Sequence, residues 1–253
     1  MRPVRSLAPL LALALVAAPA ARAVEGVNLR WDQCYGDAGA QNKSFACDTN
    51  TGTETLVGSF VLGTGIVQMG GEEIVIDLAS AGSALPPWWQ FMNAGTCRQL
   101  ALAANMMLPA TAVNCMDWSH RNASLLARWY SIGERGPSTA RLELLITEAL
   151  AATANLPGGE YLSFSLTITH ARTVGTGACA GCTEPVCIVL NSVLAITAGR
   201  VSDRFLTGPA NGTDSNFAAW QGGGSPVVGG VSGCPAATPA KQRTWGAVKA
   251  MYR

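Results

Sequence analysis

Residues 160–197, EYLSFSLTITHARTVGTGACAGCTEPVCIVLNSVLAIT, decide the fold class of this chain. Apolar and polar residues alternate from Tyr161 to Ile168, which is the period of a half-buried β-strand. A second apolar run, rich in β-branched residues, extends from Val186 to Ile196 after a loop crowded with Gly and Cys. Two strands joined by a loop with three cysteines predict a stapled hairpin in a β-sheet core.

Further short apolar segments recur along the chain, with turn residues between them. Predicted strands cover residues 27–31, 55–62, 73–78 and 141–147. The segment Asn122–Tyr130 is expected to form a short helix, because Asn122 suits an N-cap and Leu125 and Trp129 fall on one face. Six or more short strands predict an all-β fold, an antiparallel β-sandwich of jelly-roll type with short helices.

The first 23 residues predict a cleaved secretory signal. Arg2 and Arg5 precede an apolar run, and Ala21-Arg22-Ala23 supplies a small-x-small cleavage site. The apolar run is shorter than the roughly 20 residues that a membrane span needs. We therefore expect a secreted protein, extracellular or at the cell surface, whose mature chain begins at Val24 and has no membrane span.

The mature chain divides into two predicted parts. Residues 24–200 are expected to form the β-sandwich domain, and residues 201–253 a Gly/Pro-rich arm that packs on it and ends in a short helix capped by Thr244. Removal of residues 1–23, with their three arginines, leaves 14 basic and 16 acidic side chains. This weakly negative balance argues against nucleic acid as a partner.

Eight cysteines, all in the mature part, indicate up to four disulfides in an exported chain. They are Cys34, Cys47, Cys97, Cys115, Cys179, Cys182, Cys187 and Cys234. Proximity in the sequence favours Cys34–Cys47 and Cys97–Cys115, which leaves the remaining four to pair among themselves. Eight cysteines allow 105 full pairings, so the connectivity stays open at this point.

The Cys-x-x-Cys segment, Cys179 to Cys182, has two alternative interpretations. A redox motif needs a helix start behind its second cysteine to lower a thiol pKa, and Pro185 interrupts such a helix. Together with Cys187 and Cys234 the segment has the ligand count for tetrahedral zinc. An oxidising compartment favours disulfides over free thiolates, so we expect a disulfide-stapled protein.

Several motifs together resemble a family of exported bacterial proteins known from environmental genomes. The motifs are FACDTNTGTETLVGSFVL at 45–62, LPPWWQF at 85–91, GTCR at 95–98, TVGTGACAGCTEPVCIVLNSV at 173–193 and CPAATPAKQRTWGAVKAMYR at 234–253. The resemblance covers most of the mature chain. It implies a bacterial origin and export, and it implies no activity.

Two groups of residues are candidates for ligand binding. Trp88 and Trp89 follow two prolines, and a pair of exposed indoles on a β-sandwich would form a platform for sugar rings. Asp48, Asn50 and Glu54 place oxygen atoms at alternate positions of one loop, as calcium loops do. We expect no cofactor other than calcium in this loop, and the alternative to a calcium loop is a simple turn before a strand.

The candidate residues for catalysis are few. With two histidines in the chain, a secreted hydrolase would need His120 or His170 as its base, and Asp117 lies near the first of them. Carboxylates that could form a glycosidase pair are scattered over predicted strands and turns: Glu72, Glu73, Asp77, Glu143, Glu148 and Glu160. The spacing brings no two of them together.

The sequence therefore favours a secreted, non-catalytic protein of the cell surface or envelope, with a structural or binding role. A carbohydrate-binding module that uses Trp88 and Trp89 is one alternative, and a secreted hydrolase is another. The expected partners are a glycan or a second copy of the chain.

Overall fold

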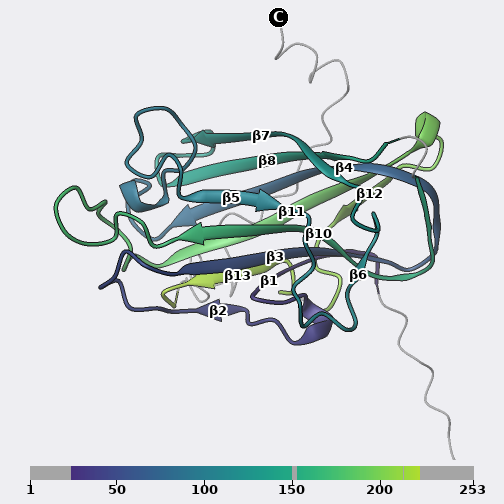
Figure 1. Ribbon diagram of the computed structural model, residues 1–253, viewed down its shortest axis with the longest axis horizontal. Coiled ribbons are helices and arrows are strands. Elements are labelled where there is room, and N and C mark those ends of the chain that lie inside the picture. The colour runs from purple at the N-terminus through teal and green to yellow at the C-terminus, as the bar shows by residue number, and fades with distance from the viewer. Residues whose placement is uncertain (1–23, 150–152, 213, 223–253) are drawn as a thin grey trace, which may run out of the picture.

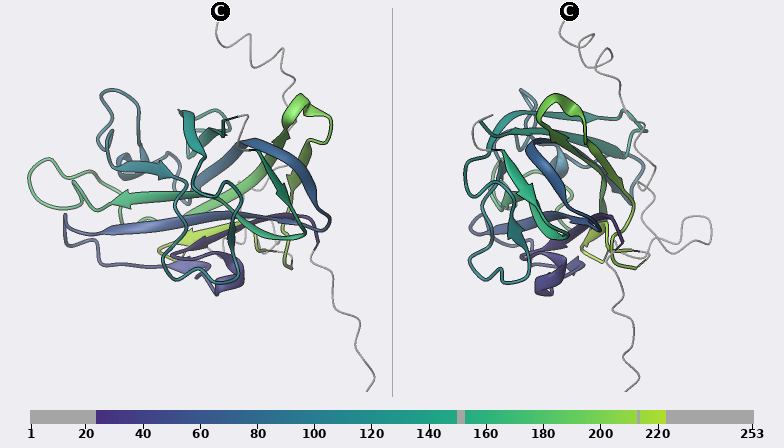
Figure 2. Two further views of the ribbon diagram at one scale, coloured as in Figure 1. Left: turned by 45° about the vertical axis from the view of Figure 1, so that its right-hand side comes forward. Right: turned by 90° about the vertical axis from the view of Figure 1, so that its right-hand side faces the viewer.

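Two β-sheets, one of five strands and one of eight, pack against each other to form a β-sandwich (Figures 1 and 2). The computed structural model describes residues 24–149, 153–212 and 214–222. The five-stranded sheet contains β1 (Gly26–Trp31), β3 (Thr53–Leu62), β10 (Gly159–Thr169) and β5 (Leu102–Asn105) in that order, with β6 (Met116–Asp117) parallel to β10.

The eight-stranded sheet has its longest strands at the centre. Its order is β2 (Asn42–Lys43), β13 (Phe217–Trp220), β11 (Val186–Thr197), β4 (Ile66–Ser80), β8 (Thr139–Thr147) and β7 (Ser124–Ile132). Two short strands, β12 (Arg204–Thr207) and β9 (Ala154–Leu156), pair with β11 and β4. Three one-turn 3-10 helices lie in the connections: η1 (Tyr35–Asp37), η2 (Pro87–Trp89) and η4 (Ala198–Arg200).

The main core lies between the two sheets and follows the alternation of the strands. Ile74, Ile76 and Leu78 of β4 share one buried cluster with Phe164 and Leu166 of β10. Successive side chains of a strand point to opposite faces, so the residues between these point away from the sandwich interior. The predicted all-β sandwich with disulfides is confirmed.

The deciding stretch forms its two strands where the sequence predicted them, but they do not form a hairpin. β10 pairs with β3 and β5 in one sheet, and β11 pairs with β4 and β13 in the other. The Cys-rich loop between them therefore crosses from one sheet to the other at one end of the sandwich (Figure 1). Both strands are apolar enough to be central in a sheet, and each finds its partners elsewhere in the chain.

The helix predicted over Asn122–Tyr130 is wrong, because this segment is the edge strand β7. A β-bulge between Leu125 and Ala127 shifts the register of β7 against β8. The bulge changes which residues face the core, from Leu125 before it to Tyr130 and Ile132 after it. The inserted residue breaks the strict alternation of a strand and leaves an apolar spacing that resembles a helix.

The sandwich extends beyond the boundary predicted at residue 200. β12 and β13 both pair with β11, so residues 204–207 and 217–220 are strands of the eight-stranded sheet. The predicted signal at 1–23, the Thr244-capped helix and Cys234 lie outside the described residues.

Three disulfides join segments that are distant in the sequence: Cys34–Cys115, Cys47–Cys182 and Cys97–Cys179. Cys187 is disulfide-bonded as well. The pairs predicted from proximity, Cys34–Cys47 and Cys97–Cys115, are therefore wrong. Each of those short segments contains a strand, β2 or β5, between its two cysteines.

Candidate functional site

One end of the sandwich is filled by aromatic rings, and we call it the aromatic end. It consists of Phe45, Trp88, Trp89, Phe91, Arg98, His170 and Trp220. Trp220 lies at its centre, with ring centroids 4.1 Å from Phe45, 5.3 Å from Trp88 and 5.5 Å from Trp89. The disulfides Cys47–Cys182 and Cys97–Cys179 hold the loops that carry these rings.

Trp88 and Trp89 are completely buried, which contradicts their predicted role as an exposed sugar platform. The Trp88 indole N–H donates to Thr173 Oγ1 at 3.1 Å, and its backbone N–H donates to the Ala180 carbonyl at 2.9 Å. The two prolines before them end strand pairing, so η2 folds inward and closes the sandwich instead of presenting the rings to solvent.

Two of the three predicted calcium ligands, Asn50 and Glu54, have other partners. Asn50 Oδ1 accepts the backbone N–H groups of Thr173 and Val174 at 2.8 and 3.0 Å, so this side chain holds the Cys-rich loop. Glu54 is buried, forms an ion pair with Lys43 at 2.5 Å and shares a hydrogen bond with His170 Nε2 at 2.9 Å. Asp48 is exposed. Among the described residues, no group of three or more His, Cys, Asp or Glu could hold a metal ion.

The candidate hydrolase residues lie at two separate places. Asp117 accepts hydrogen bonds from Ser119 and Arg121 within its own turn, and His120 is exposed beside it. His170 is buried at the aromatic end, where it stacks on Phe45 with ring centroids 4.1 Å apart. Asp117 pairs with Leu162 near the start of β10, and His170 follows its last residue. Eight extended residues span roughly 26 Å, so these groups do not form one site.

Two of the scattered carboxylates that the sequence offered for a glycosidase pair, Glu72 and Glu148, are buried. Glu72 of β4 has no solvent exposure, and Ser163 Oγ donates to its Oε2 from a bulge in β10. Burial raises the pKa of Glu72 well above the ordinary value, and burial also raises the pKa of Glu148. Neither carboxyl has an ion-pair partner among the described residues. Burial therefore favours the protonated, neutral form of Glu72.

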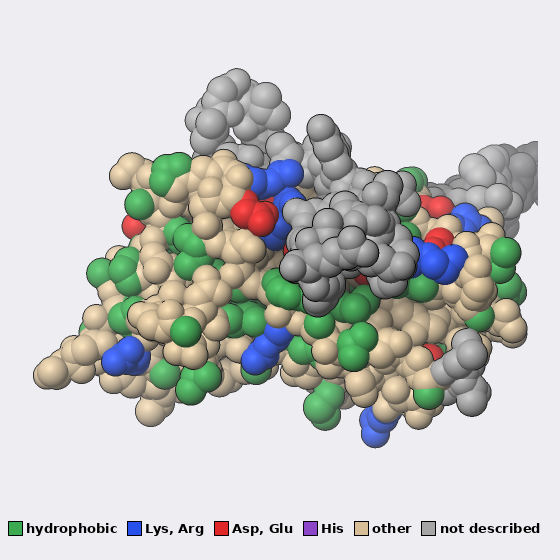
Figure 3. Space-filling view, turned by 90° about the horizontal axis from the view of Figure 1, so that it is seen from above, with side chains coloured by type: hydrophobic (Ala, Val, Ile, Leu, Met, Phe, Trp, Pro, Cys, Tyr) green, Lys and Arg blue, Asp and Glu red, His purple; other side chains and the backbone are tan. Residues whose placement is uncertain are grey.

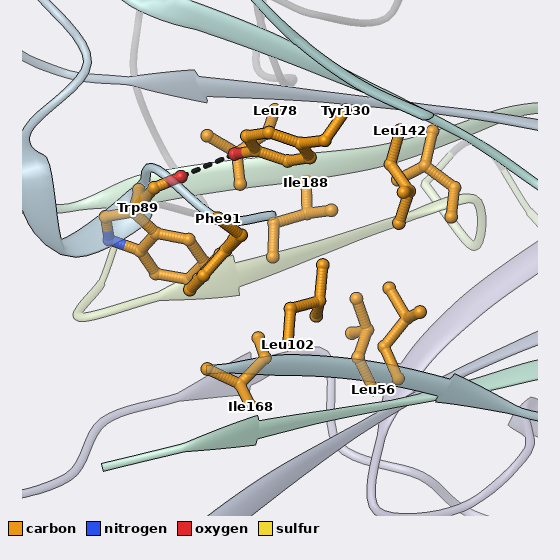
Figure 4. A pocket seen from close by; sticks show the side chains of 11 residues that line it. Leu56, Leu78, Trp89, Phe91, Leu102, Tyr130, Leu142, Ile168 and Ile188 are labelled. Carbon is orange, nitrogen blue, oxygen red and sulfur yellow. Dashed lines mark hydrogen bonds between the residues drawn. The ribbon is translucent and has the colours of Figure 1, made fainter. Parts of the chain in front are cut away.

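An apolar cavity lies between the sheets, next to the aromatic end (Figure 4). Leu78, Leu142 and Ile188 line it from the eight-stranded sheet, and Leu56 and Ile168 line it from the other. The Tyr130 hydroxyl turns away from it and donates to the Trp89 carbonyl at 2.5 Å. With about 20 Å³ and an apolar lining, this space is a packing defect and not a ligand site.

Several apolar side chains are exposed on the outer side of the five-stranded sheet. Residues 106–116, which we call the methionine loop, read MMLPATAVNCM. Met107 is 75% exposed and Val113 84% exposed, while Met116 and the neighbouring Tyr35 are 38% and 36% exposed. We call these four side chains, Tyr35, Met107, Val113 and Met116, the loop face.

Buried contacts hold the methionine loop in place under its exposed side chains. Leu108 packs on a small outer cluster that contains Val57, Leu162 and the Cys34–Cys115 disulfide. Such a loop, fixed on a rigid scaffold, is where proteins commonly carry binding residues. Methionine side chains adapt to irregular partner surfaces because they are unbranched and polarisable.

One carboxylate, Asp37 of η1, connects η1 to this loop, and a second, Glu160 of β10, holds η1 on the five-stranded sheet. Asp37 Oδ1 accepts the backbone N–H groups of Val113 and Asn114 at 3.0 and 2.8 Å. Glu160 Oε2 accepts the Gly36 N–H at 2.8 Å, and its Oε1 accepts Ser59 Oγ at 2.5 Å. Burial opposes ionisation of Asp37, but the three backbone N–H donors outweigh it and lower the pKa of this carboxyl. The sequence does not indicate these hydrogen bonds, because the residues that form them are far apart in the chain.

Among the described residues, the side of the molecule above β7 has no comparable group of exposed apolar side chains on one loop. Figure 3 shows the side above β7, where hydrophobic side chains are spread in small groups and basic and acidic side chains lie next to each other. Asp77 lies on the outward-facing side of β4 and is paired bidentately with Arg141 at 2.7 Å and with Arg135 at 3.1 Å. Asn191, from a bulge in β11, donates to the same carboxylate at 2.6 Å.

No protein-family model and no curated protein matches the sequence. Among solved structures, the fold is similar to a cohesin module from Clostridium perfringens ATCC13124 family 33 glycoside hydrolase. The identity is 9%, the match covers 73% of this chain and 96% of the module, and the TM-score is 0.31. At this TM-score the likeness carries no argument about function. No helix in the described part of the chain is long and apolar enough to cross a membrane.

Proposed function

We propose that this protein is a secreted, non-catalytic binding protein that holds a protein partner through the loop face. The observation that carries the proposal is the exposure of Met107 and Val113 on a loop that a disulfide and Asp37 keep in place. A large apolar side chain held rigidly in water has an energetic reason to be covered. Secretion is supported by the leader-like first 23 residues and by the disulfides, which persist in oxidising compartments.

A photo-cross-linking experiment tests the proposal. A photoreactive amino acid is placed at position 107 or, as a control, at position 201, where Val201 is 86% exposed but lies outside the loop face. Each form is irradiated in the medium of the cells that produce the protein. We expect one discrete protein adduct from position 107 and none from position 201.

Three outcomes would contradict the proposal. Equal adducts from both positions would indicate non-specific contact. An adduct that contains a second copy of the chain would show self-association through the loop face, which replaces the external partner by the chain itself. Retention on insoluble polysaccharides that survives Met107→Ser with Val113→Ser would assign binding to a glycan elsewhere on the surface.

A further inference from the structure

Arg98 is a buried cation, and it has no charged partner in the part of the chain that the structure describes. Its side chain is 2% exposed, and its guanidinium carbon lies 3.5 Å from the ring centroid of Trp88 and 5.4 Å from that of Phe91. Nη2 donates to the Thr169 carbonyl. Nε and Nη1 are buried and have no hydrogen-bond partner. Two sets of N–H donors of a charged group are thus left unsatisfied at the aromatic end.

The same chain satisfies its other buried arginines. Arg30 Nη1 donates to three carbonyls, those of Leu29, Ser215 and Phe217, at 2.8 to 3.1 Å. Arg141 makes its bidentate pair with Asp77. A buried charge is costly unless it is both paired and hydrogen-bonded, so Arg98 is the exception that needs an explanation.

A buried carboxyl such as Glu72 can lower this cost by binding a proton, whereas binding a proton is what charges a guanidinium. Burial lowers the pKa of Arg98 to about 9, so the side chain remains positively charged at neutral pH. Contact with two aromatic faces offsets part of the desolvation, and cation–π contacts contribute roughly 0.5–2 kcal/mol. The unpaired N–H groups still lack an acceptor.

We propose that Arg98 is the centre of a binding site for a small inorganic anion, with chloride as the simplest occupant. The groups that would bind the anion are Nε and Nη1 of Arg98, which are donors without an acceptor among the described residues. Burial of the guanidinium favours a halide, because larger and more strongly hydrated anions lose more hydration on burial. The bound anion completes the ion pair that the chain itself leaves open.

Thermal unfolding of the disulfide-intact protein tests this site. The Tm is measured at pH 7 in sodium chloride, sodium bromide and sodium gluconate at one fixed ionic strength. We expect chloride and bromide to raise the Tm relative to gluconate, by about 3–6 °C at ten times the dissociation constant. Arg98→Met should abolish this difference between the salts.

Arg172→Met is the matched control, because it removes the same charge from the same end of the sandwich. Arg172 lies in the exposed loop and donates only to the Cys97 carbonyl, at 2.7 Å. This variant should keep the full halide response.

If Arg98→Met does not fold, anomalous diffraction from bromide-soaked crystals of the unsubstituted protein tests the site instead. We expect a bromide peak in contact with Nε or Nη1 of Arg98. Equal Tm values in halide and gluconate, an unchanged response in Arg98→Met, or no bromide at Arg98 would each overturn the proposal.

Discussion

The aromatic end and the loop face are both held by disulfides, yet apolar side chains are buried at the first and exposed at the second. Cys97–Cys179 spans 82 residues and Cys34–Cys115 spans 81, so the two cross-links constrain the unfolded chain almost equally. At the aromatic end the tryptophans are turned inward and fully buried. At the loop face the methionines and Val113 are held out in water. A disulfide near an apolar cluster therefore indicates a fixed loop. Whether the loop serves packing or binding follows only from the exposure of its side chains.

Removing the central ring of the aromatic end should have the largest effect. Trp220→Ala deletes a fully buried indole that contacts four rings and donates to the Cys182 carbonyl at 2.9 Å. We expect the free energy of unfolding, measured with urea, to fall by about 5 kcal/mol. Tyr35→Ala, an aromatic truncation at the loop face, should cost under about 1 kcal/mol. Similar losses in the two variants would show that the contrast between the regions is wrong.

The two disulfides allow a matched comparison. Cys97→Ser with Cys179→Ser and Cys34→Ser with Cys115→Ser should each lower the stability by about 4 kcal/mol, since loops of nearly equal length are released. Hydrogen exchange should then separate them. Loss of Cys34–Cys115 is expected to deprotect the backbone N–H groups of residues 113–115, while loss of Cys97–Cys179 leaves them protected. Deprotection by both variants would mean that the loop is held by the fold as a whole.

Glu72 gives the core a pH dependence of known sign. Its pKa is raised in the folded state, so the unfolded chain loses the proton first as the pH rises above 4.5, and stability falls until the folded pKa is reached. Glu72→Gln removes this loss. The difference in the free energy of unfolding between the variant and the unsubstituted protein should therefore increase as the pH rises, by up to about 1.4 kcal/mol per pH unit. Urea unfolding at pH 5, 6 and 7 measures it. Glu134→Gln, at an exposed position, should follow the unsubstituted protein, and parallel curves for Glu72→Gln would show that Glu72 is ionised in the fold.

The loop face should give the smallest change in stability. Met107→Ser with Val113→Ser alters side chains that are mostly exposed, so the free energy of unfolding should change by less than about 0.5 kcal/mol per site. In the form that carries the photoreactive residue at position 107, Val113→Ser is expected to weaken the adduct described above. A loss of several kcal/mol would show instead that these side chains contribute to packing.

The strands could be predicted from the sequence because their alternation is a local signal. β1, β3, β8, β10 and β11 lie where the pattern placed them. Partners in space are not local, so the hairpin of β10 and β11 and the disulfides drawn from proximity were wrong. The bulges had no local signal either, and they decide that Leu125 belongs to a strand and that Ser163 reaches Glu72.

The candidate site was predicted least well, for a physical reason. Trp88 and Trp89 were chosen for their type, but a residue type does not determine exposure, and two prolines before them turn the chain inward. Asp37 and Glu160 act through backbone N–H groups brought from elsewhere in the chain. Arg98 is notable because Nε and Nη1 have no hydrogen-bond acceptor among the described residues, and no sequence pattern encodes such an absence.

The pattern of the disulfides has a consequence for how the chain matures. No cysteine in the three pairs is joined to its nearest neighbour in the sequence, and Cys34–Cys115 interleaves with both of the others. A chain that emerges with its N-terminus first presents Cys34 and Cys47 together, long before Cys115 and Cys182 exist to receive them. Early oxidation therefore produces the wrong bond, and reaching the native set requires thiol–disulfide exchange. The yield of correctly bonded protein should depend on isomerase activity in the compartment more than on its oxidising strength.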